Sequence, residues 1–188
     1  MKKTKNAPSN NSPLDRRGFI KTGAAAAAVG SLAIERGAFA QSSETVKVAL
    51  IGCGGRGSGA ANQALSTNGD VKLVAMADAF KDRMDSSQKG LQRAHGLKVD
   101  VKDENKFIGF DAYKKAIELA DMVILATPPG FRPVHFAEAI KQGKHVFMEK
   151  PVAVDGKGVR QVLAAAKEAK KKNLKVGVGL QRHHQLGY

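Results

Sequence analysis

Short apolar runs alternate with longer segments of helical character from residue 46 to the end of the chain. Six of these runs are predicted as strands, at residues 46–51, 71–77, 106–108, 122–126, 144–148 and 174–179. Helices are expected between them, at about residues 58–66, 80–94, 111–119 and 133–142, with a fifth that ends near residue 172. The fully apolar run at 122–126 is typical of a central strand in a parallel sheet. The alternation predicts an α/β fold in which a doubly wound parallel sheet carries helices on both faces.

One stretch of this pattern is less regular, and the helices around it carry start and stop signals. The charged segment at residues 97–105 has no clear period and is interpreted as a surface insertion, after a helix that Gly96 is expected to stop. Asp111 precedes a helical segment and is predicted to cap its N-terminus. Gly143 is expected to end the helix at 133–142.

The first apolar run leads directly into Gly52-Cys53-Gly54-Gly55-Arg56-Gly57, a Gly-x-Gly-x-x-Gly motif. The first glycine of such a motif lets the chain turn off a strand, the second lets backbone approach a pyrophosphate, and the third lets the next helix pack close to the sheet. The N-terminus of that helix then offers N–H groups and a partial positive charge to the phosphates. A lone motif is weak, and here its position between a strand and a helix supports it. We predict a Rossmann-type dinucleotide-binding domain.

Asp78 closes the second predicted strand, 26 positions after Gly52. In dinucleotide-binding folds a carboxylate about 20 residues after the motif accepts hydrogen bonds from the adenosine ribose. The alternative is an N-cap for a helix that starts near Ala79. The ribose role favours NAD, because a carboxylate repels the 2′-phosphate of NADP. Lys81 and Arg83 follow closely and could neutralise that phosphate, so NADP is kept as an alternative.

The first 40 residues have the composition of an export signal. A basic segment containing Arg16-Arg17 is followed by an alanine-rich apolar run at 23–32 and by the A-x-A cleavage site Ala38-Phe39-Ala40. The paired arginines and the modest hydrophobicity resemble a twin-arginine signal, which a receptor reads as an address. The apolar run is too short to span a bilayer, for which about 20 residues are needed.

We therefore predict a signal peptide at residues 1–40, a dinucleotide-binding domain at 41–188, and no stable membrane anchor. The expected partner is the twin-arginine translocation machinery, and the expected location is the periplasm. The alternative for the first segment is a disordered basic tail before an amphipathic helix.

The net charge of the chain is +14, and part of it belongs to the predicted signal. Seven of the 31 Lys and Arg residues and two of the 17 Asp and Glu residues lie in 1–40, so the remainder carries 24 against 15 and a charge of +9. No aromatic residue interleaves with the lysine run at 167–172, as stacking on single-stranded nucleic acid would require. We expect no nucleic-acid partner.

Cys53 is the only cysteine, which excludes an intramolecular disulfide. No histidine lies near it in sequence to activate it, so it is expected to pack as a small residue beneath the glycine turn. His183 and His184 are adjacent, so their side chains are expected to point apart, and a metal site needs further ligands. No metal site is predicted.

Four segments occur in a recognisable order along the chain. They are the glycine turn, Ala126-Thr127-Pro128-Pro129 with His135 after it, Gly143-Lys144-His145-Val146-Phe147-Met148-Glu149-Lys150-Pro151, and Val178-Gly179-Leu180-Gln181-Arg182. The third segment is the specific one. Together they resemble the Gfo/Idh/MocA oxidoreductases, which include glucose-fructose oxidoreductase and inositol dehydrogenase, over nearly all of the chain after residue 45.

This resemblance implies NAD or NADP as cofactor, with the adenosine half on the glycine turn and Asp78. It places the nicotinamide half near Thr127, Pro128, Glu149 and Lys150, with His135 as a further cofactor-binding candidate whose alternative is a structural role. Gln181 and Arg182 are implied to approach the cofactor or substrate. Lys150 is the implied catalytic residue, because an ammonium beside a developing alkoxide or carbonyl oxygen favours hydride transfer. The implied activity moves hydride between the nicotinamide and a sugar, cyclitol or polyol.

Members of this family also carry a second, α+β domain with the oligomer contact, most of the sugar pocket and an Asp-x-x-x-His pair. That domain is expected to be missing from this chain, which ends at Tyr188, so the chain alone is expected to be inactive and a homo-oligomer only if the domain exists. Two alternatives are an NAD-using glycosidase of related fold and a non-catalytic nucleotide-binding fragment.

Overall fold

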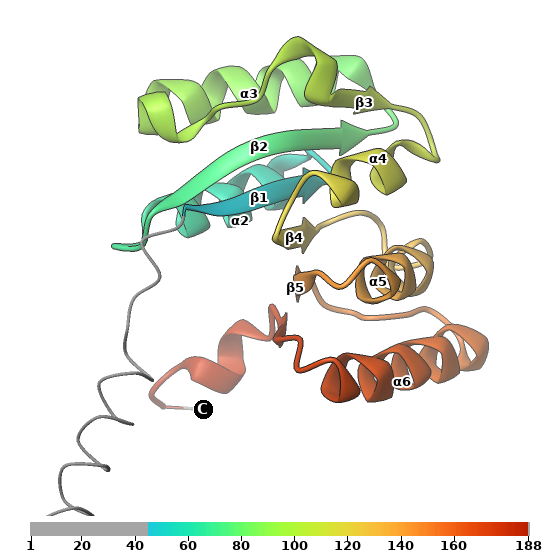
Figure 1. Ribbon diagram of the computed structural model, residues 1–188. Helices are drawn as coiled ribbons and strands as arrows, with labels where there is room; N and C mark the ends of the chain where they lie inside the picture. Colours follow the sequence, from blue (N-terminus) through green and yellow to red (C-terminus); the bar gives the residue numbers. More distant parts are fainter. Residues whose placement is uncertain (1–44, 188) are drawn as a thin grey trace, which may run out of the picture. The chain divides into compact units, whose positions relative to one another are not determined.

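The computed structural model describes residues 45–187 apart from the side chain of His184 (Figure 1). The predicted signal peptide at 1–40 and Tyr188 lie outside the described residues. Within the described range, strands and α-helices alternate as β1 (Val46–Ile51), α2 (Gly55–Leu65), β2 (Val71–Asp78), α3 (Lys81–His95), β3 (Lys106–Ile108), α4 (Ala112–Glu118), β4 (Met122–Leu125), α5 (Arg132–Lys141), β5 (His145–Met148), α6 (Gly156–Lys171) and β6 (Val176–Val178). Short 3-10 turns lie at Gly96–Lys98, Asp103–Asn105 and Gln181–His184. No helix in residues 45–187 has the length and apolar character needed to cross a membrane.

The six strands form one parallel sheet in the order β3-β2-β1-β4-β5-β6. The strand order reverses between β1 and β4, so the loops at the carboxyl ends of these two strands diverge and leave a crevice between them. This arrangement confirms the predicted doubly wound, Rossmann-type α/β fold. It also fixes where a ligand can enter, because open α/β sheets bind ligands at such a switch point.

Each face of the sheet has its own apolar core, and β1 contributes to both. Val48 and Leu50 pack on the side of α2 and α3, whereas Ala49 and Ile51 pack on the side of α4, α5 and α6. The alternation follows from the two-residue period of a strand. Figure 1 shows α4, α5 and α6 side by side along their face of the sheet. The loops at the carboxyl edge therefore rest on a sheet that is packed from both sides.

The element boundaries differ from expectation where they bear on the site. Helix α2 begins at Gly55, inside the glycine motif, rather than at residue 58, which brings its first turn to the switch point. Strand β6 is shorter than predicted and covers Val176–Val178. The predicted glycine stops are confirmed, because Gly96 and Gly143 follow α3 and α5 with φ of 54° and 75°.

The interpretation of residues 97–105 as a surface insertion is wrong. Val99 forms a parallel bridge with Leu73, and the N–H of Asp100 donates to the carbonyl oxygen of Leu73 at 2.8 Å. Val99 and Val101 are buried in the core under α2 and α3. These two valines, although their neighbours are charged, pack beside β2 and enlarge the apolar core on this face of the sheet.

The predicted cap at Asp111 is also wrong in its chemistry. Asp111 stands at the N-cap position of α4, but its side chain makes no capping bond and instead accepts from Lys114 Nζ at 2.7 Å. Its backbone already has helical φ and ψ, so the carboxylate does not face the first free N–H groups. Asp155 makes the expected bond at α6, where its Oδ1 accepts from the N–H of Gly158 at 2.6 Å.

Candidate functional site

A cavity of about 520 Å³ lies at the carboxyl edge of the sheet, between the loops that follow β1, β2, β4 and β5. Its volume is typical of a small-molecule or cofactor site. Ten of the predicted site residues line it: Gly52, Gly54, Arg56, Gly57, Asp78, Thr127, Pro128, His135, Glu149 and Lys150. Segments up to about a hundred residues apart in sequence therefore meet around one space.

The other predicted residues lie beside this cavity. Cys53 and Gly55 border a groove between α2 and α3. Gln181 and Arg182 line a neighbouring cavity of about 930 Å³ over the ends of β5 and β6. The two cavities adjoin, because Arg56, Glu149 and Lys150 line both of them.

The three motif glycines have different reasons to be glycine. Gly52 has φ of 92°, and a Cβ there would stand 2.7 Å from the backbone nitrogen of Thr127. A Cβ on Gly57 would stand 1.9 Å from the carbonyl oxygen of Gly52. Gly54, in contrast, has no atom within 4 Å of its Cβ position. Gly52 and Gly57 thus allow the turn to close against β4 and α2, whereas Gly54 leaves open space above the turn.

The N-terminus of α2 is suited to an anion. Gly54 is its N-cap residue and provides no side chain to satisfy the first N–H groups of the helix. Those groups and the positive end of the helix dipole favour phosphate oxygens. The open space at Gly54 and the uncapped helix end together fit a pyrophosphate group.

The carboxylate of Asp78 joins the end of β2 to the glycine turn. Its Oδ2 accepts from the N–H of Cys53 at 2.6 Å and its Oδ1 accepts from the N–H of Phe80 at 3.0 Å. The capping alternative is wrong, because α3 begins at Lys81 with Phe80 at its N-cap position and no side-chain cap. Asp78 lines the cavity, and each carboxylate oxygen has a second lone pair that can accept from a ligand.

The two cations after Asp78 differ in their surroundings. Lys81 pairs with Asp85 on the exposed face of α3. Arg83 lies over the ring of Phe80, with its Cζ 5.1 Å from the ring centroid, and lines the cavity. Of the two, Arg83 is therefore the one that stands beside the cavity.

Cys53 is a packing residue, as predicted. It is buried, and its Sγ lies 3.6 Å from the carbonyl oxygen of Ala77. Burial, and then the charge of Asp78, raise the pKa of the Cys53 thiol well above its usual range. The thiol is held in its unreactive form.

The loop after β4 is held by a buried histidine. His135 Nδ1 lies 3.1 Å from Oγ1 of Thr127, and its ring stacks on that of Tyr113 with 4.1 Å between centroids. Burial, and then the nearby charge of Arg132, lower the pKa of His135 to about 4. His135 is therefore neutral at physiological pH and fixes the hydroxyl of Thr127.

Arg132 is a site residue that the sequence did not reveal. It is 2% exposed, and its guanidinium donates to the carbonyl oxygens of Thr127 and Pro151. An arginine at the start of a helix, directly before Pro133, has no signal that separates it from a solvated side chain. Its role depends on two loops that only the folded sheet brings together.

Glu149 is the buried acid of the site. It is 5% exposed, and its Oε1 lies 2.7 Å from Nε of Arg56, which is about half exposed. Its carboxylate packs on Gly179, where a Cβ would stand 2.6 Å from Oε1. The ion pair joins the glycine turn to the end of β5, and it lies where the two cavities adjoin.

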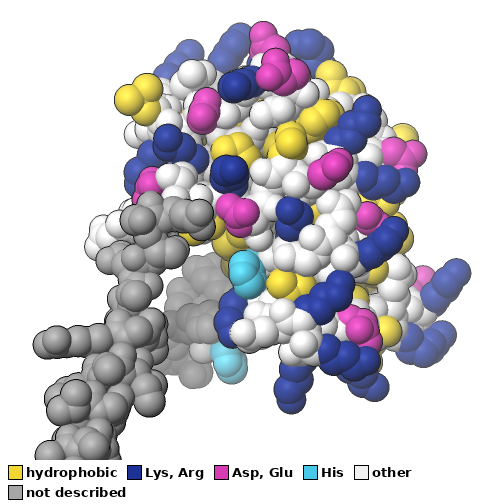
Figure 2. All heavy atoms as spheres, viewed as in Figure 1, with side chains coloured by type: hydrophobic (Ala, Val, Ile, Leu, Met, Phe, Trp, Pro, Cys, Tyr) yellow, Lys and Arg dark blue, Asp and Glu magenta, His cyan; other side chains and the backbone are white. Residues whose placement is uncertain are grey.

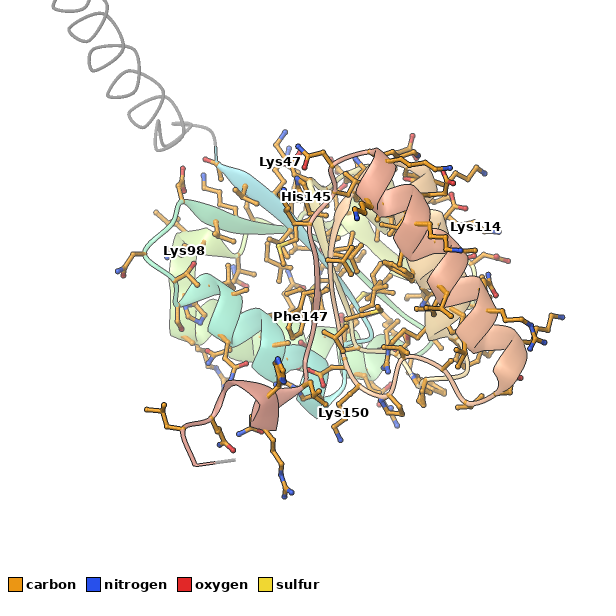
Figure 3. All side chains as sticks on the ribbon, turned by 90° about the horizontal axis from the view of Figure 1, so that it is seen from below. Lys47, Lys98, Lys114, His145, Phe147 and Lys150 are labelled. Carbon is orange, nitrogen blue, oxygen red and sulfur yellow. The ribbon has the colours of Figure 1, made fainter. Side chains whose placement is uncertain are left out.

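Lys150 is exposed at the carboxyl end of β5. Figure 3 shows it past the end of β5 opposite to His145, with Phe147 between them. It lines both cavities, so its ammonium can reach a ligand in either. Lys150 is thus an accessible cation of this part of the site.

No group of three or more His, Cys, Asp or Glu residues in the described part of the chain is arranged to hold a metal ion. Figure 2 shows Lys and Arg side chains spread over the visible face and interleaved with Asp and Glu.

Comparison with known proteins places this geometry in a family. Residues 46–179 match the Gfo/Idh/MocA oxidoreductase family, NAD-binding Rossmann fold. The chain belongs to this family. The glycine turn and the cavity lie within the residues that match this NAD-binding domain. Residues 13–33 match a twin-arginine translocation signal sequence, which indicates export across the cytoplasmic membrane.

Individual relatives agree with this assignment. An inositol 2-dehydrogenase from Rhizobium meliloti is 32% identical over 128 residues, which cover 68% of this chain and 34% of the relative. A glycosyl hydrolase family 109 protein from Solibacter usitatus is 32% identical over 113 residues, which cover 58% of this chain and 25% of the relative. The chain thus spans about a third of the length of these curated relatives or less.

The fold is also found in solved structures of inositol dehydrogenases. A scyllo-inositol dehydrogenase from Lactobacillus casei, solved with NAD(H) and scyllo-inositol, superimposes with a TM-score of 0.60 at 23% identity. The match covers 76% of this chain and 38% of the Lactobacillus protein. At this identity the likeness shows the fold.

Proposed function

We propose that the protein is an NAD-dependent oxidoreductase that acts on a secondary alcohol of a sugar, cyclitol or related polyol. The observation that carries the proposal is that the glycine turn and Lys150, about a hundred residues apart in sequence, line one cavity. The similarity to an inositol 2-dehydrogenase over 68% of this chain supports a cyclic polyol as the substrate class.

The cavity extends along the carboxyl edge of the sheet from Asp78 to Lys150, and we propose that a dinucleotide lies across it. We assign the adenosine half to the side of β1 and β2, with the pyrophosphate over Gly54 and the ribose at Asp78. The nicotinamide half then falls on the side of β4 and β5, beside Thr127, Pro128 and Lys150. Asp78 favours NAD over NADP, because its charge opposes a 2′-phosphate.

The charges around the cavity suit this ligand. Arg56 belongs to the first turn of α2, and Arg132 and Lys150 lie on the side of β4 and β5. Glu149 compensates one of these cations through its ion pair with Arg56. The remaining positive charge attracts the two negative charges of a pyrophosphate.

Lys150 is the residue we assign to the reaction. When bound, NAD would supply the acceptor for the hydride of the carbinol carbon, and the hydroxyl proton would pass to water. The ammonium of Lys150 would donate a hydrogen bond to the alcohol oxygen and stabilise the negative charge that develops there. We assign Gln181 and Arg182, which line the adjoining cavity, to the substrate side. His135 is buried and bonded to Thr127, so we assign it to orientation of that loop.

The twin-arginine signal leads to a proposal on location. We propose that residues 1–40 are removed after Ala40 and that the remaining protein works in the periplasm, after transfer by the twin-arginine machinery. This route carries folded cargo, which agrees with a domain that loads its nucleotide in the cytoplasm.

A second candidate function is an NAD-using glycosidase, in which a sugar carbon is oxidised transiently and no net redox change occurs. The observation that favours it is the 32% identity to a glycosyl hydrolase family 109 protein. The match at Glu149-Lys150-Pro151 favours the dehydrogenase.

A form of the protein that carries the family's second, α+β domain should be incubated with NAD and a panel of cyclitols, polyols and glycosides, with NADH followed by absorbance and released sugar by chromatography. NADH formed from a free polyol is the expected result. Release of sugar without NADH would establish the glycosidase, and binding of NADH without either product would leave a non-catalytic nucleotide-binding module.

Two lysine variants sharpen this assay. Lys150→Met should abolish turnover and retain NADH binding, because it removes the ammonium from the cavity. Lys157→Met is the matched control, since Lys157 is exposed in the first turn of α6 and lines neither cavity. Equal turnover in the Lys150→Met variant and the wild type would contradict the catalytic assignment.

A further inference from the structure

We propose that Arg132 is a positioning residue that holds the loops after β4 and β5 at the spacing needed by the nicotinamide half of the cofactor. The inference rests on the proposed function, because it assigns that half to these two loops. Arg132 itself contacts two backbone carbonyls, and through them it holds the residues that line the cavity in place.

Arg132 connects the two loops directly. Its Nη2 donates to the carbonyl oxygen of Thr127, and its Nη1 donates to the carbonyl oxygen of Pro151. Thr127 is followed by Pro128, and Pro151 is preceded by Lys150. Each bond therefore fixes a backbone group adjacent to a residue that lines the cavity.

Two other hydrogen bonds also hold these loops, so the contribution of Arg132 is the contact beyond them. The N–H of Glu149 donates to the carbonyl oxygen of Leu125 at 3.0 Å, which is the last backbone bond between the ends of β4 and β5. The hydroxyl of Thr127 is bonded to His135 at 3.1 Å. Beyond these contacts the loops separate, and the guanidinium of Arg132 spans the interval between them.

The environment of Arg132 makes the guanidinium hard to replace. The residue is 2% exposed, and among residues 45–187 no carboxylate lies within ion-pair distance of it. Its Nε has no hydrogen-bond partner in the same part of the chain. Burial of this charge costs free energy, which the two carbonyl acceptors and the nearby charge of Glu149 offset. The two bonds use the planar fork of the guanidinium. Lysine cannot reproduce that fork, because its ammonium is a single point.

A purely structural arginine would affect every ligand of the domain alike. A positioning residue on the side of β4 and β5 should affect the nicotinamide half and spare the adenosine half. ADP reports on the glycine turn and Asp78 alone, whereas NADH reports on both halves. The ratio of their dissociation constants therefore separates the two roles.

The test is calorimetric titration of the 188-residue chain and its Arg132→Lys and Arg132→Ala variants with NADH and with ADP. Both variants should weaken NADH by about tenfold or more and leave ADP within about twofold of the wild type. Leu65→Ala in α2 is the control for lost stability, because Leu65 is buried in the core on the other face of the sheet, away from both loops, and lines none of the three cavities described. It should change neither ligand.

Chemical rescue gives a second measurement on Arg132→Ala. Guanidinium ion at tens of millimolar, far below the molar range in which it unfolds proteins, should restore NADH affinity, and ammonium at the same ionic strength should not. Equal changes for NADH and ADP, or no change for either, would overturn the inference. A folded wild-type chain that binds neither ligand would overturn the proposed function and this inference with it, whereas a wild type that binds NADH no more tightly than ADP would overturn this inference alone.

Discussion

The two halves of the cavity are built by different means. On the side of β1 and β2 the backbone makes the site, because Gly52 and Gly57 bring main chain to distances that no Cβ allows. On the side of β4 and β5 two buried charged side chains make it, Glu149 through its ion pair with Arg56 of α2 and Arg132 through its two bonds to loop carbonyls. In the first half, stability and nucleotide binding should therefore be lost when a side-chain atom is added to a glycine. In the second half, they should be reduced when one partner of a charged contact is removed.

The largest effect should come from an added methyl group in the backbone-built half. Gly57→Ala places a Cβ 1.9 Å from the carbonyl oxygen of Gly52, so the turn must shift. We expect the free energy of unfolding to fall by about 3 kcal/mol or more and nucleotide binding to be lost. Urea unfolding and NADH titration measure both effects.

Gly90→Ala is the matched control for this substitution. Gly90 lies exposed within α3, and its Cβ position is open. The alanine should raise stability by about 0.5–1 kcal/mol, because glycine is a poor helix residue. A Gly57→Ala variant as stable as Gly90→Ala would show that the close contact is not needed.

The buried histidine of the other half predicts a pH dependence. The pKa of His135 is lowered from 6.5 to about 4, so the unfolded chain binds a proton that the folded chain does not. Stability should therefore fall as the pH falls from about 6.5 to about 4, by about 3 kcal/mol in total. His135→Gln keeps an acceptor for Thr127 and should lose this contribution. Unfolding midpoints with the same pH slope in both proteins would contradict the burial of a neutral ring.

The Arg56–Glu149 pair should respond unequally to loss of either partner. Arg56→Gln leaves the buried carboxylate of Glu149 without its cation, which should cost about 1–3 kcal/mol. Glu149→Gln leaves Arg56 half exposed to water, which should cost less than about 1 kcal/mol. Chemical unfolding of both single variants and of the double variant measures the asymmetry. The reverse order of costs would mean that Glu149 is not the buried member of the pair.

The sequence predicted the backbone-built half of the site better than the half built by side chains. The glycine motif, its strand and the turn before α2 are local, and the need for glycine follows from the spacing alone. Arg132 was missed because its partners, Thr127 and Pro151, are carbonyl groups that carry no residue signal. The contact between Arg56 and Glu149 joins residues 93 positions apart, and only the strand order brings them together.

For the fold too, local patterns were predicted from the sequence and contacts between distant segments were missed. The six strands were predicted from apolar runs along the chain. Val99 and Val101 were missed, because charged neighbours hide two residues that pack beside β2. Gln181 and Arg182 were predicted for the cofactor site on the family pattern, and the fold places them in the adjoining cavity.

The last prediction concerns the choice between cofactors. Asp78→Ala should weaken NADH by about tenfold and NADPH by less, because only the 2′-hydroxyl of NADH can donate to the carboxylate. Asp100→Ala is the control, since Asp100 is exposed and lies outside both cavities. Fluorescence titration with each nucleotide measures the two affinities. Equal loss for NADH and NADPH would contradict the ribose assignment.

The most direct test of the account is titration of the folded 188-residue chain with NADH, followed by the fluorescence of the nucleotide. The account predicts saturable binding that is tighter than that of NADPH, because the cavity offers a pyrophosphate site at Gly54 and a carboxylate at Asp78. Absence of binding at millimolar NADH, with circular dichroism showing a folded chain, would contradict the claim that this edge of the sheet is a dinucleotide site.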